Sequence, residues 1–198
     1  SRPFSGRLTD RVGRIPVMAF GSLVCFVCGL LYPLFAAVIP FLFLRLLHGF
    51  STGFKPTGTA AYIADIIPAN RRGEALGIYG MSVSIGSALG PALGSWIAQV
   101  VSINALFYTS SFLAFLSIAI LYNMEETLPN KQPLSWNALR IGRKDIFEPK
   151  VVPPSVVVFL TYFSFGAVLT LIPDFSDHLG VANHGLYFLV YMTTSLLV

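Results

Sequence analysis

Long apolar runs alternate with short polar segments along the chain. The complete runs cover about 16–37, 40–65, 75–100, 103–122 and 152–173, and a sixth run continues to Val198. A helix rises about 1.5 Å per residue, so each complete run is long enough to cross a hydrocarbon layer of ~30 Å. The pattern predicts an all-α, polytopic transmembrane helical bundle with about five full spans and part of a sixth.

Composition favours lipid over a large soluble core as the environment of these runs. Charged residues make up 11% of the 198 positions and apolar residues 55%, whereas an ordinary soluble domain is roughly 25% charged. Helices satisfy their own backbone and can therefore expose apolar side chains to lipid. A soluble core would not explain why the runs have membrane length. We therefore expect the lipid bilayer to be a partner of this chain.

Basic residues are sorted by loop. All but two of the 13 Lys and Arg residues precede the first run or lie at 68–74 and 123–151, and the exceptions are Arg45 and Lys55. The remaining loops, near 38–40, 101–104 and 174–184, contain no Lys or Arg. This alternation follows the positive-inside rule and predicts that the basic segments face the cytoplasm. Because the basic residues are spread over three loops, they form no single patch for nucleic acid. We expect no nucleic-acid partner.

The second run carries polar and ionisable residues on one face. At about 100° per residue, six of them form a stripe about 100° wide: Arg45, His48, Thr52, Lys55, Thr59 and Tyr62. A charge at the bilayer centre costs ~2.5–3.5 kcal/mol, so we expect this stripe to line a polar cavity. Snorkelling of Arg45, or a buried structural ion pair, is the alternative. Pro56 lacks a backbone donor and is expected to bend the helix.

No metal site or nucleotide site is evident. Cys25 and Cys28 share a face of the first run, but no second Cys or His pair accompanies them. No G-x-x-x-x-G-K-S/T loop occurs either. The chain starts without Met and stops inside an apolar run, so we interpret it as a fragment of a longer protein.

The basic segment before the first run contains the pattern G-x-x-x-D-R-x-G-R, formed by Gly6, Asp10, Arg11, Gly13 and Arg14. Two glycines permit a tight turn there. This loop resembles the one that joins helices two and three of the major facilitator superfamily, where it latches the two halves of the protein. The resemblance implies that these residues control gating, and we consider Asp65 a candidate ionic partner of one arginine.

Two further motifs resemble the same family. The string from Arg45 to Gly53 resembles R-x-x-x-G-x-x-x-G of helix four, which implies that Arg45 couples transport to protonation; His48 replaces the frequent Gln. In the third run, G-x-x-x-G-P-x-x-G resembles the helix-packing motif of antiporters on helix five. The residues that carry this motif are Gly86, Gly90, Pro91 and Gly94. Ser95 departs from the usual closing glycine. Small residues at this spacing allow close helix approach in any case.

The resemblance sets the expected organisation. Residues 1–122 would belong to an N-terminal half with helices three to six, 123–151 would form a cytoplasmic central loop, and 152–198 would begin a C-terminal half with helices seven and eight. The substrate site would lie at the midplane between the halves. The remaining helices of the full-length transporter would be partners of this chain.

The family implies a secondary active transporter and no enzyme. We expect proton-coupled efflux of small amphipathic compounds, with small-molecule substrates and protons as partners. The proton gradient would supply energy without a cofactor, in the cytoplasmic (inner) membrane of a bacterium. An ion-coupled importer of a sugar, organic acid or other metabolite is the main alternative, which Lys55 favours. A membrane receptor that does not transport is a third interpretation.

Overall fold

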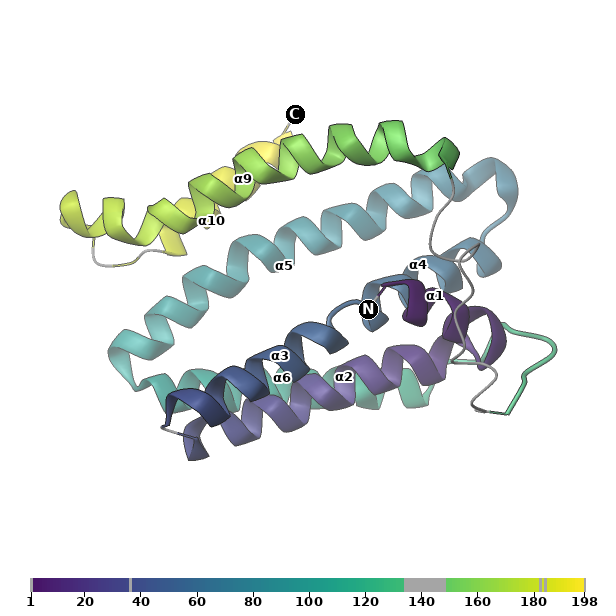
Figure 1. The fold of residues 1–198 in the computed structure, drawn as a ribbon, viewed down its shortest axis with the longest axis horizontal. Coiled ribbons are helices and arrows are strands. Elements are labelled where there is room, and N and C mark those ends of the chain that lie inside the picture. Colours follow the sequence, from purple (N-terminus) through teal and green to yellow (C-terminus); the bar gives the residue numbers. More distant parts are fainter. Residues whose placement is uncertain (1, 36, 134–148, 182, 184, 198) are drawn as a thin grey trace. The chain divides into compact units, whose positions relative to one another are not determined.

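The computed structural model describes residues 2–35, 37–133, 149–181, 183 and 185–197, and these residues form helices and no strands (Figure 1). The α-helices are α1 (Arg2–Arg11), α2 (Arg14–Leu31), α3 (Val38–Ser51), α4 (Phe54–Ile66), α5 (Arg72–Val100), α6 (Ile103–Tyr122), α9 (Val152–His178) and α10 (Gly185–Leu197). Short 3-10 turns occupy Tyr32–Leu34 (η1), Ala69–Arg71 (η2) and Pro149–Val151 (η3). The all-α fold is therefore confirmed.

The chain divides into two compact units. The first contains α1 to α4, the start of α5 up to Ile78, and α6; the second contains the rest of α5 with α9 and α10. The division expected at 123–151 stays a prediction, and most of that segment lies outside the described residues.

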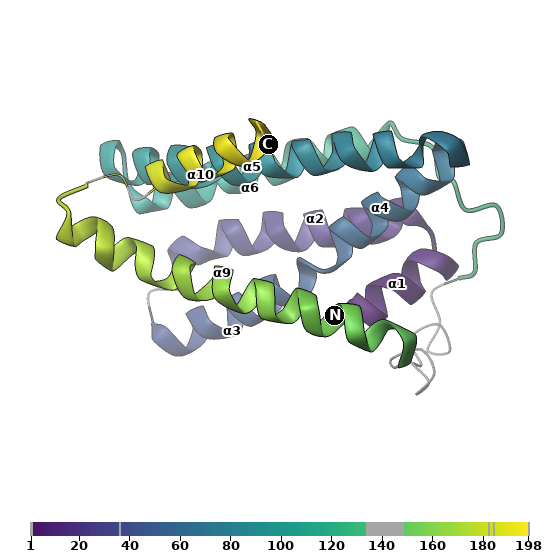
Figure 2. The same ribbon diagram turned by 90° about the horizontal axis from the view of Figure 1, so that it is seen from above.

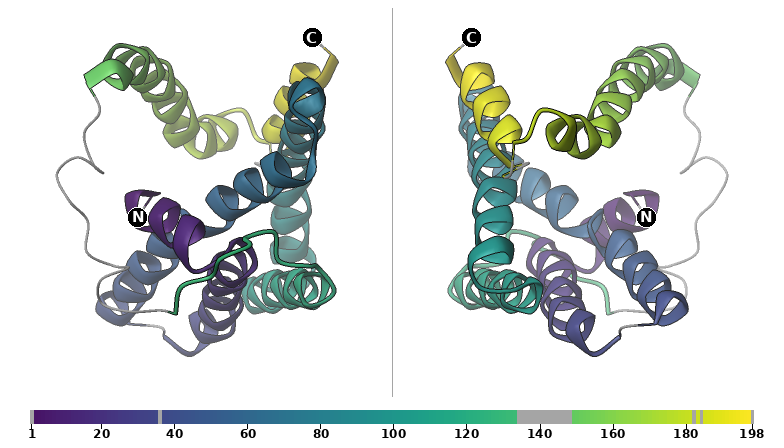
Figure 3. Two further views of the ribbon diagram at one scale, coloured as in Figure 1. Left: turned by 90° about the vertical axis from the view of Figure 1, so that its right-hand side faces the viewer. Right: turned by 90° about the vertical axis from the view of Figure 1, so that its left-hand side faces the viewer.

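Helix α2 is the centre of the first unit. It contacts α1, α3, α4 and α6, and α3 and α6 flank it in the view along the helices (Figure 3). Two close approaches show why small residues occupy these interfaces. A Cβ on Gly58 of α4 would lie 2.7 Å from Met18 Cγ and 3.1 Å from the Arg14 carbonyl, and a Cβ on Gly29 would overlap Ser111 of α6. Glycine therefore allows α4 and α6 to pack directly on α2.

In the second unit, α10 begins against α5 (Figure 2). A Cβ added to Gly185 would overlap the backbone of Pro91 and Ala92. Helix α9 ends five residues beyond the expected boundary at 173, because a glycine cap closes it at Gly180. Gly180 has φ 71°, its N–H bonds to the Asp177 carbonyl, and the Val181 N–H bonds to that of Ser176. This C-terminal motif uses the left-handed conformation that glycine tolerates, so the residues just after the predicted run belong to the helix.

Four helical stretches among the described residues are long and apolar enough to cross a membrane: Arg14–Leu34, Ala69–Val100, Ile103–Tyr122 and Val152–Ile172. They match the predicted first, third, fourth and fifth runs. The predicted second run is split instead between α3 and α4, of 14 and 13 residues. Most large apolar side chains on these helices are exposed, as expected for a chain that faces lipid.

The interruption between α3 and α4 lies at Thr52–Gly53, not at Pro56 as expected. Pro56 is the third residue of α4, where a helix has no intrahelical use for the N–H. Hydroxyl groups satisfy the carbonyls around the interruption. Thr52 donates to the Gly49 carbonyl at 2.7 Å, and Thr57 and Ser5 both donate to the Gly53 carbonyl, at 2.7 and 2.9 Å. The bond from Ser5 also attaches α1 to this interruption.

We predict that Gly58→Val lowers the free energy of unfolding by about 1–3 kcal/mol, because the added methyl groups overpack the interface with α2. Gly49→Val is the matched control, since it makes the same change in helix propensity and a Cβ at Gly49 meets nothing within 4 Å. Unfolding of both purified variants in detergent measures the difference. Equal losses would contradict the close approach of α4 to α2.

Candidate functional site

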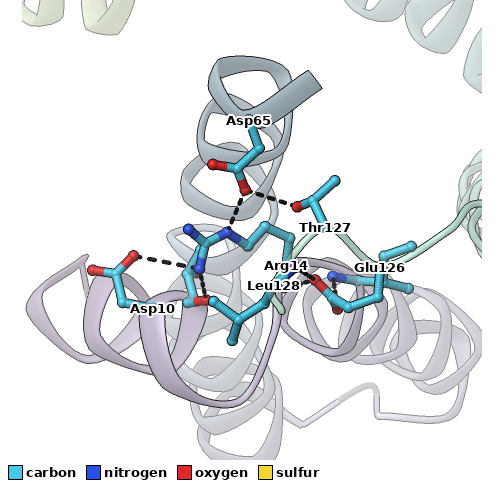
Figure 4. Close-up of polar contacts among 8 residues, drawn as sticks. Asp10, Arg14, Asp65, Glu126, Thr127 and Leu128 are labelled. Carbon is cyan, nitrogen blue, oxygen red and sulfur yellow. Dashed lines mark hydrogen bonds and ion pairs between the residues drawn. The ribbon is translucent and has the colours of Figure 1, made fainter. Parts of the chain in front are cut away.

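The predicted gating residues gather at the start of α2 in the first unit. Three segments meet there: the end of α1, the end of α4 and the segment that follows α6 (Figure 4). Helix α1 continues to Arg11, so the predicted loop is reduced to Val12 and Gly13. Gly6 lies inside α1 with nothing within 4 Å of a Cβ position. The expectation that Gly6 forms part of the tight turn is therefore wrong.

Arg14 is the centre of this cluster. Its side chain is only 12% exposed, and its Nε donates to Asp65 Oδ2 at 2.9 Å. Its Nη1 lies 3.6 Å from Asp10 Oδ1 and donates to the Thr9 carbonyl. A guanidinium has five donors in a fixed fork, so one side chain ties the ends of α1 and α4 to the start of α2. Of the candidate arginines, the structure pairs Asp65 with Arg14.

The carboxylate of Glu126 caps α2 from the segment after α6. Its Oε1 accepts from the backbone N–H of Arg14 at 2.9 Å, and its Oε2 accepts from that of Ile15 at 3.1 Å. A third bond, from the Leu128 N–H at 3.1 Å, fixes the carboxylate within its own segment. The first N–H groups of a helix have no intrahelical partner, and negative charge is favourable at this end. The Glu126 carboxylate accepts from these N–H groups and also places a negative charge at this end of α2.

Gly13 makes the cap possible. It has φ 136°, which side chains other than glycine rarely adopt, and a Cβ there would overlap the Glu126 carboxylate. Burial acts to raise the pKa of Glu126, but backbone hydrogen bonds from Arg14, Leu128 and Ile15 and the charge of Lys131 outweigh it. The pKa of Glu126 therefore lies below its ordinary value.

Two other contacts attach the segment after α6 to this end of the unit. Thr127 donates to Asp65 Oδ2 at 2.7 Å, so one carboxylate oxygen serves both Thr127 and Arg14. The Gln132 N–H donates to the Arg11 carbonyl at 2.8 Å. Neither Glu126 nor Thr127 was predicted from the sequence. Their only local signal is a pair of acidic residues directly after an apolar run on the basic side of the chain.

The stripe predicted on the second run is divided by the interruption at Thr52–Gly53. Arg45 and His48 belong to α3, whereas Lys55, Thr59 and Tyr62 belong to α4. The exposed members are Arg45, Thr52 and Lys55, and the half-buried ones are His48, Thr59 and Tyr62. Thr59 donates to Met18 Sδ at 3.2 Å and His48 lies 3.0 Å from the Tyr32 hydroxyl. Both of these contacts are made with the first span.

The predicted packing motif lies on α5 in the second unit. A Cβ at Gly86 or Gly90 would meet nothing within 4 Å, whereas Pro91 lies against Gly185 of α10. Gly94 is half-buried. The role of these four residues as an antiporter motif stays a prediction. No group of three His, Cys, Asp or Glu residues in the part of the chain that the structure describes could hold a metal ion.

Apolar helices of spanning length and a charged cluster at one end of the first unit define an integral membrane protein of the helical-bundle class. The chain matches the Major Facilitator Superfamily over residues 1–198 and belongs to this family. The fold agrees with that of a peptide transporter, POT, in a crystal structure with a TM-score of 0.55 and 17% identity; the match covers 90% of this chain and 37% of that one.

Several relatives carry names that refer to multidrug resistance or to export. Multidrug resistance protein 1 of Bacillus subtilis is 28% identical, with 89% of this chain and 45% of that protein covered. The multi-drug resistance efflux pump PmrA of Streptococcus pneumoniae is 32% identical, with 85% and 43% covered. The staphylopine export protein of Staphylococcus aureus is 23% identical, with 94% and 48% covered. The chain thus spans less than half the length of these three relatives.

We predict that Glu126→Gln destabilises the protein by about 1 kcal/mol, the usual cost of a lost helix cap, while Glu125→Gln leaves stability unchanged. Glu125 is the exposed neighbour and thus the matched control. Because the pKa of Glu126 is lowered on folding, its contribution is present above the pKa of the unfolded chain and disappears as pH falls through the folded value. Unfolding measured from neutral pH to below about pH 4 should show this loss in the parent protein and not in Glu126→Gln. The cap would be contradicted if Glu126→Gln lost as much stability in acid as the parent protein does.

A double-mutant cycle tests the ion pair between Arg14 and Asp65. We expect Arg14→Gln and Asp65→Asn to be coupled by about 1 kcal/mol in the free energy of unfolding, since Arg14 is largely buried and the pair is hydrogen-bonded. Arg71→Gln with Glu74→Gln is the control cycle, because that pair is exposed on both sides. Additive losses at Arg14 and Asp65 would refute the pairing.

Proposed function

We propose that this chain is part of a secondary transporter that exports small amphipathic compounds in exchange for protons. One observation carries the proposal: over 85–94% of the chain it is similar to proteins named for multidrug resistance, multidrug efflux or staphylopine export. We place the transporter in the cytoplasmic (inner) membrane of a bacterium with the basic segments in the cytoplasm. The alternation of basic loops with uncharged or acidic ones supports this orientation.

Arg45 is the proposed coupling residue. It is exposed on α3, with its guanidinium carbon 6.0 Å from the centre of the Phe41 ring. A cation in an apolar span is stable only where it meets a partner, water or a ligand. Thr52 and Lys55 are exposed nearby along the same run, which supports a polar cavity there. Protons would alter the charge around Arg45 and His48 and so favour one state of the transporter over the other.

The cluster around Arg14 is the proposed latch. Alternating access requires two states that bind each ligand with different affinity, and a latch contributes by stabilising one of them. Arg14 contacts three segments, through Asp10 of α1, Asp65 of α4 and Glu126 after α6, so movement of any one would change its contacts. The partners of the transporter would be a small-molecule substrate, protons, lipid and the remaining helices, and the proton gradient would drive it without a cofactor.

Everted vesicles that contain the transporter provide the test. With an imposed proton gradient, we expect fluorescent lipophilic compounds to accumulate, and we expect Arg45→Ala to reduce the rate by tenfold or more, the loss that ~1.4 kcal/mol produces. Arg71→Ala is the control, since Arg71 pairs with Glu74 at the surface and should leave transport unchanged. Entry of metabolites into right-side-out vesicles, with no accumulation of lipophilic compounds, would reject export in favour of import.

A further inference from the structure

Tyr32 is a buried aromatic residue at the end of α2 opposite the proposed latch. It lies on η1, is only 5% exposed, and forms the core of its region with Cys28 and Leu44. Its ring centre lies 4.9 Å from that of Phe107 on α6 and 5.3 Å from that of Phe41 on α3. Three elements thus fix the ring and determine where its hydroxyl points.

The hydroxyl of Tyr32 is directed at His48. Its oxygen lies 3.0 Å from His48 Nδ1, and the rings lie 5.9 Å apart. The same hydroxyl interacts with the guanidinium of Arg45, one turn earlier on α3. A guanidinium can only donate, so it uses a lone pair of the phenol oxygen. The hydroxyl hydrogen is then available for Nδ1.

The direction of this hydrogen bond sets the form of the histidine. In neutral imidazole one nitrogen is a donor and the other an acceptor, so a Tyr32 hydroxyl that donates to Nδ1 leaves the ring proton on Nε2. Nε2 has no hydrogen-bond partner among the described residues. The ionisable groups that act on His48 are Arg45 on its own helix and Tyr32 on η1, and Cys25 and Cys28 on α2 act on Tyr32. The carboxylates around Arg14 lie at the other end of α2.

We propose that Tyr32 is a positioning residue of the transport site, which holds neutral His48 with its proton on Nε2 and so presents Nε2–H as a donor to substrates that carry a hydrogen-bond acceptor. The inference rests on the proposed function, because it assigns a specificity to the same site. It distinguishes two kinds of amphipathic compound. Those with an ester or carbonyl acceptor would bind His48, whereas those without an acceptor would bind by apolar and charge contacts alone.

The tautomer is tested directly by nitrogen NMR of the purified full-length transporter with labelled histidine. The signals of His48 are identified by their loss in His48→Gln. We expect the Nε2–H tautomer in the parent protein and in Tyr108→Phe, the control on exposed Tyr108 of α6, and a mixture of both tautomers in Tyr32→Phe. A parent protein with its proton on Nδ1, or an unchanged tautomer in Tyr32→Phe, would overturn the proposal.

Binding gives the second readout. We expect Tyr32→Phe to raise the Kd of an ester-bearing rhodamine dye about fivefold, a typical worth of one neutral hydrogen bond, and to leave the Kd of tetraphenylphosphonium, which has no acceptor, unchanged. Melting temperatures of Tyr32→Phe and Tyr108→Phe check that both variants fold. An equal loss for both compounds would indicate a merely structural role and overturn the proposal. If vesicles transport neither compound, the proposed export function fails, whereas the tautomer of His48 still decides the role of Tyr32.

Discussion

The first turn of α2 is the point on which the basic end of the first unit depends. It presents backbone N–H groups and a guanidinium in nearly the same place, and carboxylates from distant parts of the chain satisfy both. Glu126 accepts hydrogen bonds from the N–H groups, and Asp65 accepts one from the guanidinium. Because both acceptors are needed by the same turn, the ends of α1 and α4 and the segment after α6 are held to one helix. The same turn therefore organises the cluster that we propose as the latch.

A chain of contacts runs from this end to the proposed transport site. Helix α2 begins with Arg14 in the latch and leads directly into Tyr32, which touches His48 and Arg45. Between these ends, α4 packs on α2 at Gly58 and Thr59. A rigid helix that is fixed at both ends to functional groups can transmit small displacements between them, since packed interfaces do not deform continuously. Helix α2 therefore connects the proposed latch with the proposed coupling residue.

The sequence predicts most of the spans but few of the contacts between them. The run 103–122 agrees with α6 residue for residue, because apolar length alone determines such a helix. The many polar residues of Arg2–Arg11 predict a loop, although the segment is the helix α1. Glu126 and Tyr32 could not be assigned, because their partners lie 112 and 16 positions away and only the fold brings them together. The interruption at Thr52–Gly53 depends on hydroxyl bonds that no periodicity reveals.

That interruption has a consequence for membrane insertion. Neither α3 nor α4, with 14 and 13 residues, is long enough to cross the bilayer alone, and unpaired carbonyls between them would cost several kcal/mol in hydrocarbon. The Gly53 carbonyl is covered by Ser5 of α1 as well as by Thr57 of its own helix. A carbonyl that would otherwise face hydrocarbon is thus satisfied within its own helix at insertion, and packing of α1 against α4 adds a second hydrogen bond to it.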